Sequence, residues 1–476
     1  MKIQAFNPIL PSYEYIPDAE PRVFGDRVYL YGSHDQFNGT EYCMNSYVGW
    51  SASVDDLSNW RYEGVILEKG KDPLDPNGEL MYYASDAIQG KDQRYYLYYA
   101  IKNLSIISVA VCDSPAGKYE FLGHVKYSNG KVLGSQPDEP FQFDPCIFID
   151  DDGRIFLYSG FNPPNKKMFN RRIVGAMVME LEDDMVTLKH GPKVIIGKKQ
   201  KGFKKHEFFE APSMRKINGT YYLIYSSFPN TSWLCYATSK YPDKGFVYKG
   251  IIVANNDVFE NSPERKRPKN YSGNNHGGIV DIHGQWYIFY HRNTNRHGFS
   301  RQACAEKINF TEDGEIPQVE ITSCGLNNGP LVAIGEYSAG IACNLKGKRG
   351  ISILRTMFDK KLPYITQDGE DRDHTPCQYI VNIWDGAVIG YKYFTFTETI
   401  NQFSITSRGT GKGVLLISIV PGGEPLAKVS VTPSADWKKA SAFFKMPIGE
   451  HPLYIKYKGK DTIDILSFSF NHINEL

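Results

Sequence analysis

One short pattern recurs five times in the first two thirds of this 476-residue chain. Each copy opens on a glycine turn and continues, after a few polar residues, into a strand-like run rich in aromatic residues. The glycines are Gly25, Gly90, Gly153, Gly219 and Gly284, at spacings of 65, 63, 66 and 65 residues. A repeat of this regularity constrains the fold strongly, because every copy must form the same supersecondary unit.

Each repeat contains further strand-like segments. After the aromatic run comes an apolar strand, such as Val48–Ser53, then a turn rich in Ser and Asp and a closing aromatic segment, such as Trp60–Tyr62. With one strand before the glycine, a unit holds about four strands without helical periodicity, which is typical of a β-propeller blade. Five blades in a ring bury the faces that one blade would expose. A stack of separate sandwich domains is the alternative, but it does not explain the constant period.

The repeat ends near residue 325, and a turn-rich segment, Cys324–Pro330, follows it. The remaining residues read as alternating strands, which favours a β-sandwich of the jelly-roll type. The aromatic content of 14%, with 43 glycines and 27 prolines, fits short strands joined by tight turns. We therefore expect an all-β chain, with a five-bladed β-propeller at residues 1–328 and a β-sandwich at residues 329–476.

Charge and hydropathy exclude several classes of function. Lys plus Arg (54) and Asp plus Glu (53) nearly cancel, so the chain lacks the positive charge of a nucleic-acid-binding protein. No stretch approaches the roughly 18–20 apolar residues of a membrane span. Residues Met1–Pro8 contain no continuous apolar run, and the eight cysteines form no C-x-x-C motif. We expect a reduced, cytoplasmic protein, although a leader absent from this sequence would leave the same pattern.

One polar residue stands at an equivalent position in each repeat, 10–12 residues before an aromatic residue of the second strand. These residues are Asp18, Asp86, Asp144, Glu210 and His276. The starts of the innermost strands of a propeller converge on its axis, so we expect the five side chains to share one pocket. Converging carboxylates repel each other and resist desolvation, so such a group indicates chemistry or a bound cation. That each acid caps a turn would explain one Asp, but not five aligned positions.

Two carboxyl groups across a pocket suit the hydrolysis of a glycosidic bond. One acid protonates the leaving oxygen, while the other activates water or attacks the anomeric carbon. A third acid can raise the pKa of the proton donor through repulsion between like charges. Blades one and four are two steps apart in a ring of five, which suggests room for a water. Inverting enzymes separate their carboxyl groups by roughly 6.5–9.5 Å, and retaining enzymes by about 5–5.5 Å.

Several motifs resemble glycoside hydrolase family 43. They are Pro17–Phe24, Tyr29–Asp35, Phe143–Pro145, Phe209–Pro212 and Asn274–Gly278. The resemblance covers roughly residues 5–325. It implies a five-bladed propeller of the arabinofuranosidase, xylosidase and arabinanase group, with an inverting mechanism.

The resemblance also implies roles for single residues. Matched by motif, Asp18 would be the general base and Glu210 the general acid, while Asp144 would tune the pKa of Glu210 and orient it. His276 matches a histidine that helps to hold a hydrated Ca²⁺ on the axis in many members. A histidine that only forms hydrogen bonds in the pocket is the alternative for that position.

Two further residues are expected to bind substrate. Arg292, in the segment Tyr290–Arg292, resembles the arginine that contacts the sugar in the family, with a surface ion pair as the alternative. Asp86 is expected to bind sugar hydroxyls.

The tail resembles a family 6 carbohydrate-binding module. The matching segments are Gly390–Phe394, Ser407–Gly409, Trp437 and Asp464–Phe468. The acidic opening of such modules is not evident near residues 336–350, so we expect the tail mainly to pack against the propeller. Trp384 could be a sugar platform or a core residue, and we favour the core.

The resemblance leads to a specific expectation of function. We expect an inverting, exo-acting α-L-arabinofuranosidase that removes side chains from arabinoxylan or its oligosaccharides. A β-D-xylosidase, or an enzyme with both activities, is the nearest alternative, because the two sugars present similar hydroxyls. A non-catalytic sugar-binding propeller is the alternative from another class, and the presence of all three acids argues against it. The oligomeric state is left open.

Overall fold

The computed structural model describes residues 4–163, 172–203, 205–351, 360–374, 378–397 and 401–472. Strands dominate these ranges, and the helices within them are two short 3-10 turns, η1 (Pro263–Arg265) and η2 (Ala339–Ile341). The expected all-β class is therefore confirmed. Among the described residues, no helix is long and apolar enough to cross a membrane.

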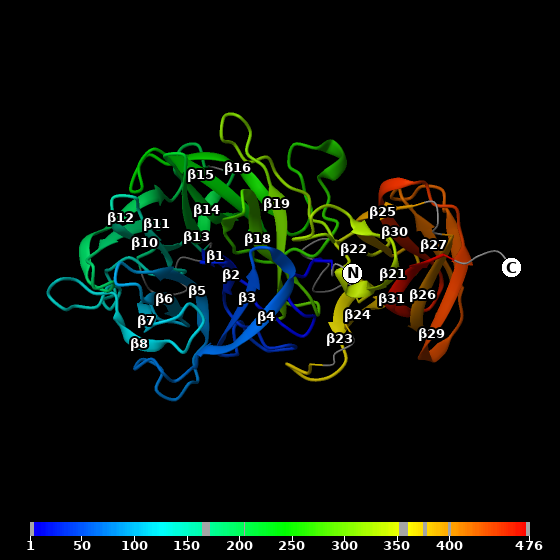
Figure 1. Cartoon of the computed structure of the whole chain (residues 1–476), viewed down its shortest axis with the longest axis horizontal. Helices are drawn as coiled ribbons and strands as arrows, with labels where there is room; N and C mark the ends of the chain where they lie inside the picture. Colours follow the sequence, from blue (N-terminus) through cyan, green and yellow to red (C-terminus); the bar gives the residue numbers. More distant parts are fainter. Residues whose placement is uncertain are drawn as a thin grey trace.

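The first part of the chain forms five antiparallel sheets in sequence order (Figure 1). The first contains β1 (Glu20–Phe24), β2 (Arg27–Tyr31), β3 (Tyr47–Ser53) and β4 (Asp56–Leu67). The second contains β5 (Tyr82–Gln89), β6 (Tyr95–Ile101), β7 (Ile107–Cys112) and β8 (Glu120–His124). The third contains β9 (Cys146–Ile149), β10 (Ile155–Phe161), β11 (Gly175–Leu181) and β12 (Leu188–Gly197). The fourth contains β13 (Glu207–Ile217), β14 (Thr220–Phe228), β15 (Trp233–Ser239) and β16 (Val247–Ala254).

The fifth sheet has three strands where the repeat predicted about four. They are β17 (Ile279–Ile282), β18 (Gln285–Asn293) and β19 (Arg301–Ile308). The N-terminal segment covers the outer edge of β19, where the amide of Ile9 donates to the carbonyl of Ala303 at 3.0 Å. The Asn7 side chain accepts from the amide of Ala305 at 2.9 Å. The start of the chain thus satisfies backbone groups that an unpaired edge would leave open.

The recurring glycine forms the turn between the first two strands of a sheet. Gly25 and Gly284 have φ of +61° and +82°, a region that L-residues adopt at a cost. In the second sheet this positive φ falls on Gln93 (+69°) instead of the glycine. The glycine spacing follows the spacing of the sheets because each glycine lies in the tight hairpin between the first two strands of a sheet.

The first strands of the sheets lie next to one another. β5 contacts β1 and β9, β13 contacts β9, and β17 contacts β1. A parallel backbone bridge between Ala19 and Gly277 joins the first sheet to the fifth. Residues that precede these strands therefore gather at a common centre, although they come from distant positions in the chain.

The C-terminal part consists of two six-stranded sheets. One contains β20 (Leu331–Val332), β22 (Asn344–Lys346), β25 (Val388–Phe396), β27 (Lys412–Ser418), β28 (Ala427–Val431) and β30 (Gly449–Lys460). The other contains β21 (Gly335–Ser338), β23 (Tyr364–Gln367), β24 (Gln378–Ile383), β26 (Gln402–Gly409), β29 (Ser434–Phe443) and β31 (Ile463–Asn471). Alternate residues of the strands, including Phe394, Phe403 and Phe468, share one buried apolar cluster. The predicted boundary at residue 328 falls between β19 and β20.

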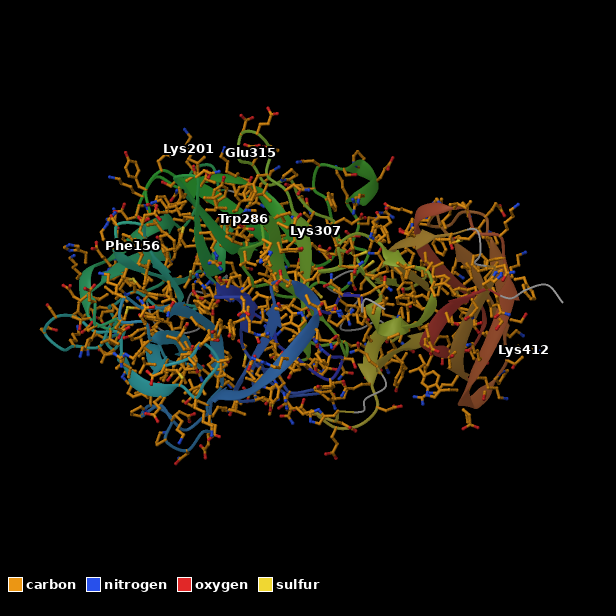
Figure 2. All side chains as sticks on the ribbon, viewed as in Figure 1. Phe156, Lys201, Trp286, Lys307, Glu315 and Lys412 are labelled. Carbon is orange, nitrogen blue, oxygen red and sulfur yellow. The ribbon has the colours of Figure 1, made fainter. Side chains whose placement is uncertain are left out.

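Trp384 is not a core residue, contrary to our expectation. Its ring is half-buried beside a surface cleft, with the ammonium of Lys361 4.5 Å from the ring centre. Charged side chains such as Lys201, Glu315 and Lys412 lie on the outer surface, whereas Phe156 is buried between sheets (Figure 2). This distribution agrees with the near-zero net charge, because ions of both signs cover the surface.

The two parts of the chain share polar contacts that are buried. Lys392 on β25 lies 2.9 Å from a carboxylate oxygen of Asp257 and 2.9 Å from one of Glu320, both in the N-terminal part. Arg292 on β18 donates to the carbonyl of Gly340 at 2.7 Å. Because charged groups are costly to bury without partners, these contacts hold the two parts in a defined arrangement.

Candidate active site

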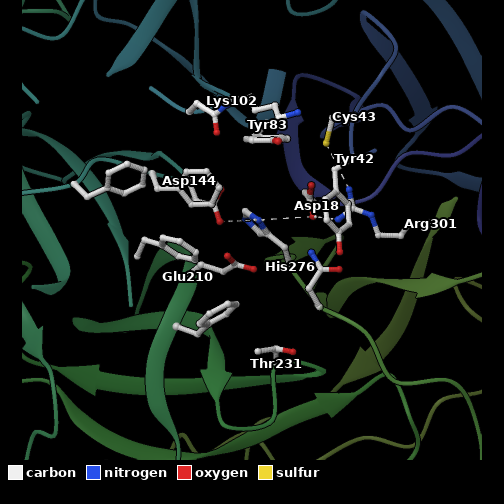
Figure 3. A pocket seen from close by; sticks show the side chains of 16 residues that line it. Asp18, Tyr42, Cys43, Tyr83, Lys102, Asp144, Glu210, Thr231, His276 and Arg301 are labelled. Carbon is white, nitrogen blue, oxygen red and sulfur yellow. Dashed lines mark hydrogen bonds and ion pairs between the residues drawn. The ribbon is translucent and has the colours of Figure 1, made fainter. Parts of the chain in front are cut away.

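Four of the five aligned residues line one cavity of about 520 Å³ (Figure 3). Asp18 precedes β1, Asp144 precedes β9, Glu210 lies in β13 and His276 precedes β17. Each therefore comes from a different sheet, at or near the strand that contacts its neighbours around the centre. The structure thus confirms that these four side chains converge on one cavity.

The backbone at these positions departs from regular strand geometry. Asp18 and Asp144 have φ of +57° and +48°, and Ala211, directly after Glu210, has φ of +64°. Such values are uncommon for residues with a side chain and are frequent at functional sites. The pairing of β13 with β14 also changes register on both sides of Glu210. Irregularities of this kind redirect a side chain from the face it would otherwise occupy.

Asp18 is surrounded by groups that favour its ionised form. Its Oδ2 accepts a hydrogen bond from the Ser33 hydroxyl at 2.6 Å, and its Oδ1 accepts one from Nη1 of Arg301 at 3.1 Å. Burial by itself would raise the pKa of Asp18, but the charge of Arg301, the neighbouring histidines and the Ser33 hydrogen bond lower it below its ordinary value. Asp18 is therefore a carboxylate, able to accept a proton.

Glu210 has the opposite electrostatic environment. It is buried, and its carboxyl group forms no hydrogen bond with another residue in the described ranges. Burial and the negative charge of Asp18 raise its pKa to about 8. Glu210 therefore carries a proton at neutral pH and can donate it.

Asp144 lies next to the backbone of the fourth sheet. Its Oδ2 accepts a hydrogen bond from the amide of Ala211 at 3.1 Å, which fixes the chain next to Glu210. Burial, together with repulsion from Glu210 and Asp18, raises the pKa of Asp144 well above its ordinary value. This geometry fits an orienting group whose charge is coupled to that of Glu210.

His276 lies among the acids, with Nδ1 3.7 Å from Oδ2 of Asp144 and 4.0 Å from Oδ1 of Asp18. Burial lowers its pKa, so the imidazole is neutral at physiological pH. Across the described residues, no group of three or more His, Cys, Asp or Glu side chains could hold a metal ion directly. The described side chains around His276 therefore do not form a cage of protein ligands for calcium.

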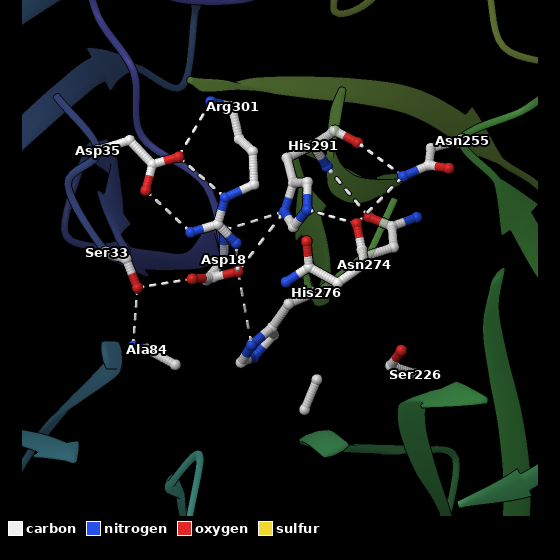
Figure 4. A network of polar contacts seen from close by, with 12 residues as sticks. Asp18, Ser33, Asp35, Ala84, Ser226, Asn255, Asn274, His276, His291 and Arg301 are labelled. Atoms are coloured by element: carbon white, nitrogen blue, oxygen red, sulfur yellow. Dashed lines mark hydrogen bonds and ion pairs between the residues drawn. The ribbon is translucent and has the colours of Figure 1, made fainter. Parts of the chain in front are cut away.

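Three buried residues of the site had not been singled out from the sequence. Arg301, the first residue of β19, donates from Nε and Nη2 to the two carboxylate oxygens of Asp35, at 2.9 Å each (Figure 4). His291 lies behind Asp18, with Nδ1 3.6 Å from Oδ1, and burial lowers its pKa to about 3. Asp35 closes the Tyr29–Asp35 motif, a signal that could have been followed, whereas no local pattern marks Arg301.

Arg292 does not line the cavity, and this corrects both expectations for it. The guanidinium is buried and donates to Gly340 of the C-terminal part and to Gln302 at 2.8 Å. Successive residues of a strand point to opposite faces, so His291 reaches Asp18 while Arg292 points away. The cationic group beside the acids is that of Arg301.

Asp86 likewise lies outside the cavity, contrary to the expected contact with sugar hydroxyls. Its two oxygens accept from Nε and Nη2 of Arg22, at 2.8 and 2.5 Å, and Oδ2 also accepts from the amide of Ile147 at 2.9 Å. The carboxylate is thus committed to neighbouring segments and links the first three sheets. An acid at this aligned position could take part in the chemistry of the pocket or stabilise the structure around its strand. Asp86 stabilises the structure.

The cavity is chemically asymmetric. Part of its lining is a cluster of aromatic rings in mutual contact, and the rest includes the ionic and amide groups of the site. The aromatic residues are Tyr83, Phe141, Phe143, Phe161 and Phe209. Asn274, Thr231 and Arg301 are among the polar lining residues. An apolar lining together with directed polar groups suits a ligand that has C–H faces and hydroxyl edges.

Comparison with known proteins identifies the family of this chain. The family model described as "Glycosyl hydrolases family 43" matches residues 6–316. A xylosidase/arabinosidase of Thermoclostridium stercorarium is 50% identical over 477 residues, covering 98% of this chain and 99% of the relative. A β-xylosidase of Xylanibacter ruminicola is 28% identical and covers 60% of this chain and 89% of the relative.

Solved structures show the same fold. A family 43 arabinoxylan arabinofuranohydrolase from Bacillus subtilis matches with a TM-score of 0.52 at 20% identity, covering 98% of this chain and 97% of that one. A family 43 β-xylosidase/α-arabinofuranosidase from a compost microbial metagenome matches at 26% identity with a TM-score of 0.52, covering 66% and 97%. The β-propeller architecture of this group is therefore shared, and the alternative of a non-catalytic sugar-binding protein has no support. This chain belongs to glycosyl hydrolase family 43 and is a glycoside hydrolase.

Proposed function

We propose that the enzyme is an inverting, exo-acting glycosidase that removes α-L-arabinofuranosyl groups from arabinoxylan or its oligosaccharides. The observation that carries the proposal is the meeting of three acids in one cavity, with Asp18 held by Arg301 and Glu210 left without a hydrogen-bond partner among the described residues. A paired cation keeps one acid ionised, and an apolar setting keeps the other protonated. Those are the two charge states that hydrolysis of a glycoside requires.

The proposed reaction uses each acid once. Glu210 gives its proton to the glycosidic oxygen as the bond between that oxygen and the anomeric carbon breaks. Asp18 takes a proton from a water molecule, whose oxygen forms a bond to the anomeric carbon from the opposite face of the sugar. The products are the free sugar with inverted configuration and the shortened alcohol. Asp144 holds the backbone beside Glu210, and the two acids titrate as a coupled pair, so Asp144 influences the proton that Glu210 donates.

The second candidate is a β-D-xylosidase, alone or combined with arabinofuranosidase activity. It is favoured by the 50% identical relative, whose name includes both activities and which matches this chain over nearly its whole length. The compost enzyme, which was solved in a complex with xylotriose, also has both activities in its name. The same cavity could admit either sugar, because both present hydroxyls in similar positions to the polar lining.

For the fold, we propose that the five sheets are the blades of a β-propeller spanning residues 1–328, and that the C-terminal sheets form a β-sandwich over residues 329–476. The contacts between successive first strands and the single apolar cluster between the last two sheets support this description. The likeness of the C-terminal part to a family 6 carbohydrate-binding module stays a prediction.

Two further expectations stay predictions. A hydrated Ca²⁺ near His276 would need waters as most of its ligands, and its test is calcium binding by calorimetry on enzyme first treated with chelator. The cytoplasmic location agrees with the free thiols of the seven cysteines in the described ranges. Its test is the location of the protein in fractionated cells.

The choice of substrate is tested with paired nitrophenyl α-L-arabinofuranoside and β-D-xylopyranoside. We expect the arabinofuranoside to have the higher kcat/KM, and comparable values would establish the dual enzyme. Proton NMR of the first product should show the inverted anomer, and a retained anomer would reject the assigned roles of Asp18 and Glu210. Activity on neither substrate, with release of sugar from another furanoside, would reject the substrate class and leave the mechanism intact.

A further inference from the structure

A segment of the C-terminal part reaches the N-terminal part beside the catalytic cavity. We call residues 364–374, which comprise β23 and the turn after it, the arm. The carbonyl of Ile365 accepts from the amide of Asn295 at 2.8 Å, and Gln367 accepts from the hydroxyl of Tyr15 at 2.6 Å. The arm thus contacts the segment before β1 and the loop before β19, both of which lead directly into the site.

Asp371 in the arm binds the loop between β2 and β3. Its Oδ1 accepts from the amide of Phe37 at 2.6 Å, and its Oδ2 accepts from the side-chain amide of Asn45 at 2.9 Å. The same nitrogen of Asn45 donates to the backbone carbonyl of Asp35 at 3.1 Å. One carboxylate therefore joins the first half of this loop to its last residues, and through Asn45 it holds the backbone of Asp35.

From Asp35 the contacts continue to the acid of the first sheet. The Asp35 carboxylate is fully buried and accepts from the backbone amide, Nε and Nη2 of Arg301, at 3.0, 2.9 and 2.9 Å. Nη1 of Arg301 donates to Asp18 at 3.1 Å (Figure 4). A series of hydrogen bonds, which passes through the backbone and side chain of Asp35, thus joins Asp371 in the last third of the chain to Asp18 near its beginning.

We propose that Asp371 is a positioning residue for the glycosidase reaction, acting through Asn45, Asp35 and Arg301 to hold Asp18 in its catalytic geometry. This inference rests on the proposed role of Asp18 as general base. It makes the C-terminal part a component of the active site and not only a neighbouring module. Loss of a positioning contact is expected to matter because displacement of a catalytic group by about 1 Å can cost about a hundredfold in rate.

The arm has a second anchor, which allows Asp371 to be tested without undocking it. Nη1 of Arg372 lies 2.8 and 2.9 Å from the two carboxylate oxygens of Glu14. That pair, together with the Ile365 and Gln367 contacts, does not involve Asp371. Substitution of Asp371 should therefore free the loop between β2 and β3 while the two parts of the chain stay associated.

The test compares Asp371→Ala, Asn45→Ala and the double variant in the full chain. Asp368→Ala is the matched control, because Asp368 lies in the same arm and its side chain contacts Tyr379 and Arg408 of the C-terminal part. We expect Asp371→Ala and Asn45→Ala each to lower kcat about tenfold or more with KM changed less than threefold. The double variant should have a kcat close to that of the less active single variant, because both substitutions break the same series of contacts. Asp368→Ala should have normal kcat.

A comparison of leaving groups distinguishes the base side of the reaction from the acid side. A nitrophenyl glycoside needs little protonation, so it should rescue Glu210 variants but not Asp371→Ala, whose kcat should fall equally on nitrophenyl and natural substrates. A normal kcat in Asp371→Ala, or additive effects in the double variant, would overturn the proposal. A loss confined to natural substrates would also overturn it.

Two controls keep the outcomes separate. Thermal unfolding of Asp371→Ala should match that of Asp368→Ala within about 3 °C, and a much larger fall restricted to Asp371→Ala would mean a structural role only. Asp18→Asn is measured in parallel. If Asp18→Asn is active, the proposed function fails, whereas if it is inactive and Asp371→Ala is normal, only the positioning role fails.

Discussion

Asp18 and Glu210 share a cavity, yet their surroundings move their pKa values in opposite directions. Arg301 supplies a cation at hydrogen-bond distance from Asp18, whereas Glu210 has burial and a neighbouring negative charge. Both residues carry a carboxyl group, so the opposite shifts in pKa come from the groups around them. In the proposed mechanism, Asp18 acts as the base and Glu210 as the acid because Arg301 forms its hydrogen bond with Asp18.

Removal of either acid should abolish most of the activity. We expect Asp18→Asn and Glu210→Gln each to lower kcat on a natural glycoside by about a hundredfold or more, because each removes one proton transfer. Asp26→Asn is the matched control, since Asp26 is exposed in the turn after Gly25. Steady-state kinetics measures the effect, and near-normal turnover in either acid variant would reject its role.

The pH dependence has a defined sign. The proposed reaction needs Asp18 ionised, which holds above its lowered pKa, and Glu210 protonated, which holds below about pH 8. Activity should therefore fall as the pH rises through about 8. Because repulsion from Glu210 helps to raise the pKa of Asp144, the two acids titrate as a coupled pair, so Asp144→Asn should remove or shift the basic limb of the profile. A profile of kcat/KM against pH checks this, and an unchanged basic limb would contradict it.

The protonated state of Glu210 also has a consequence for stability. Its pKa is about 8 in the folded protein and near its ordinary value when unfolded, so the unfolded state loses this proton at lower pH. Folding is therefore progressively disfavoured by this group as the pH rises from about 4.5 to about 8. Glu210→Gln should have a Tm at pH 7 at least equal to that of the parent enzyme. Calorimetry at pH 5 and 7 tests this, and a lower Tm confined to pH 7 would contradict it.

At the scale of strands, alternation decides which neighbours enter the site. His291 and Arg292 follow each other on β18, but one reaches Asp18 and the other reaches the C-terminal part. On β13 the change of register at Glu210 interrupts this alternation and turns the acid toward the cavity. Regular strands therefore build the frame, and their irregularities aim the functional groups.

The buried lysine of β25 offers a test of the contact between strands of the two parts. Lys392→Met should lower the free energy of unfolding by about 3 kcal/mol, because the buried carboxylate of Asp257 would lose one of its cations, and so would Glu320. Lys428→Met on β28 is the matched control, since Lys428 is exposed. Chemical denaturation measures the difference, and equal stability of the two variants would show that the ion pair contributes nothing.

At the scale of the whole molecule, the two parts share a polar interface and are not independent domains joined only by a linker. Arg292, Asp257 and Glu14 of the N-terminal part all have partners in the C-terminal part. Separation would expose or leave unpaired each of these groups. The cavity that holds the three acids is lined by the N-terminal part, and the arm of the C-terminal part binds the loop that contributes Tyr42 and Cys43 to that cavity.

Truncation tests this dependence directly. A chain that ends at residue 330 should express poorly or unfold at a clearly lower temperature, and it should have little activity, because its buried charges lose their partners. The full chain should unfold in a single calorimetric transition. A soluble, fully active truncated chain would show that the interface is dispensable, contrary to this expectation.

The sequence by itself determined the repeated elements. The glycine of each hairpin, the aromatic run after it and the acids before the first strands are local features that recur with the sheets, so Asp18, Asp144 and Glu210 could be found by alignment of the chain with itself. The same alignment selected Asp86, because position in a repeat does not reveal that Arg22 occupies the carboxylate. A local pattern thus predicts which strand a residue belongs to and its position in that strand, but not which other side chain it will contact.

Only the tertiary structure decided which charges meet. Arg301 lies 283 positions from Asp18, and Asp371 lies 334 positions from Phe37, so no local pattern relates the members of either pair. Their energies depend on distance, burial and direction, which arise when the sheets close around a centre and the C-terminal part docks. The positions of the acids can therefore be found from local sequence patterns, whereas their charge states depend on contacts that form only in the folded protein.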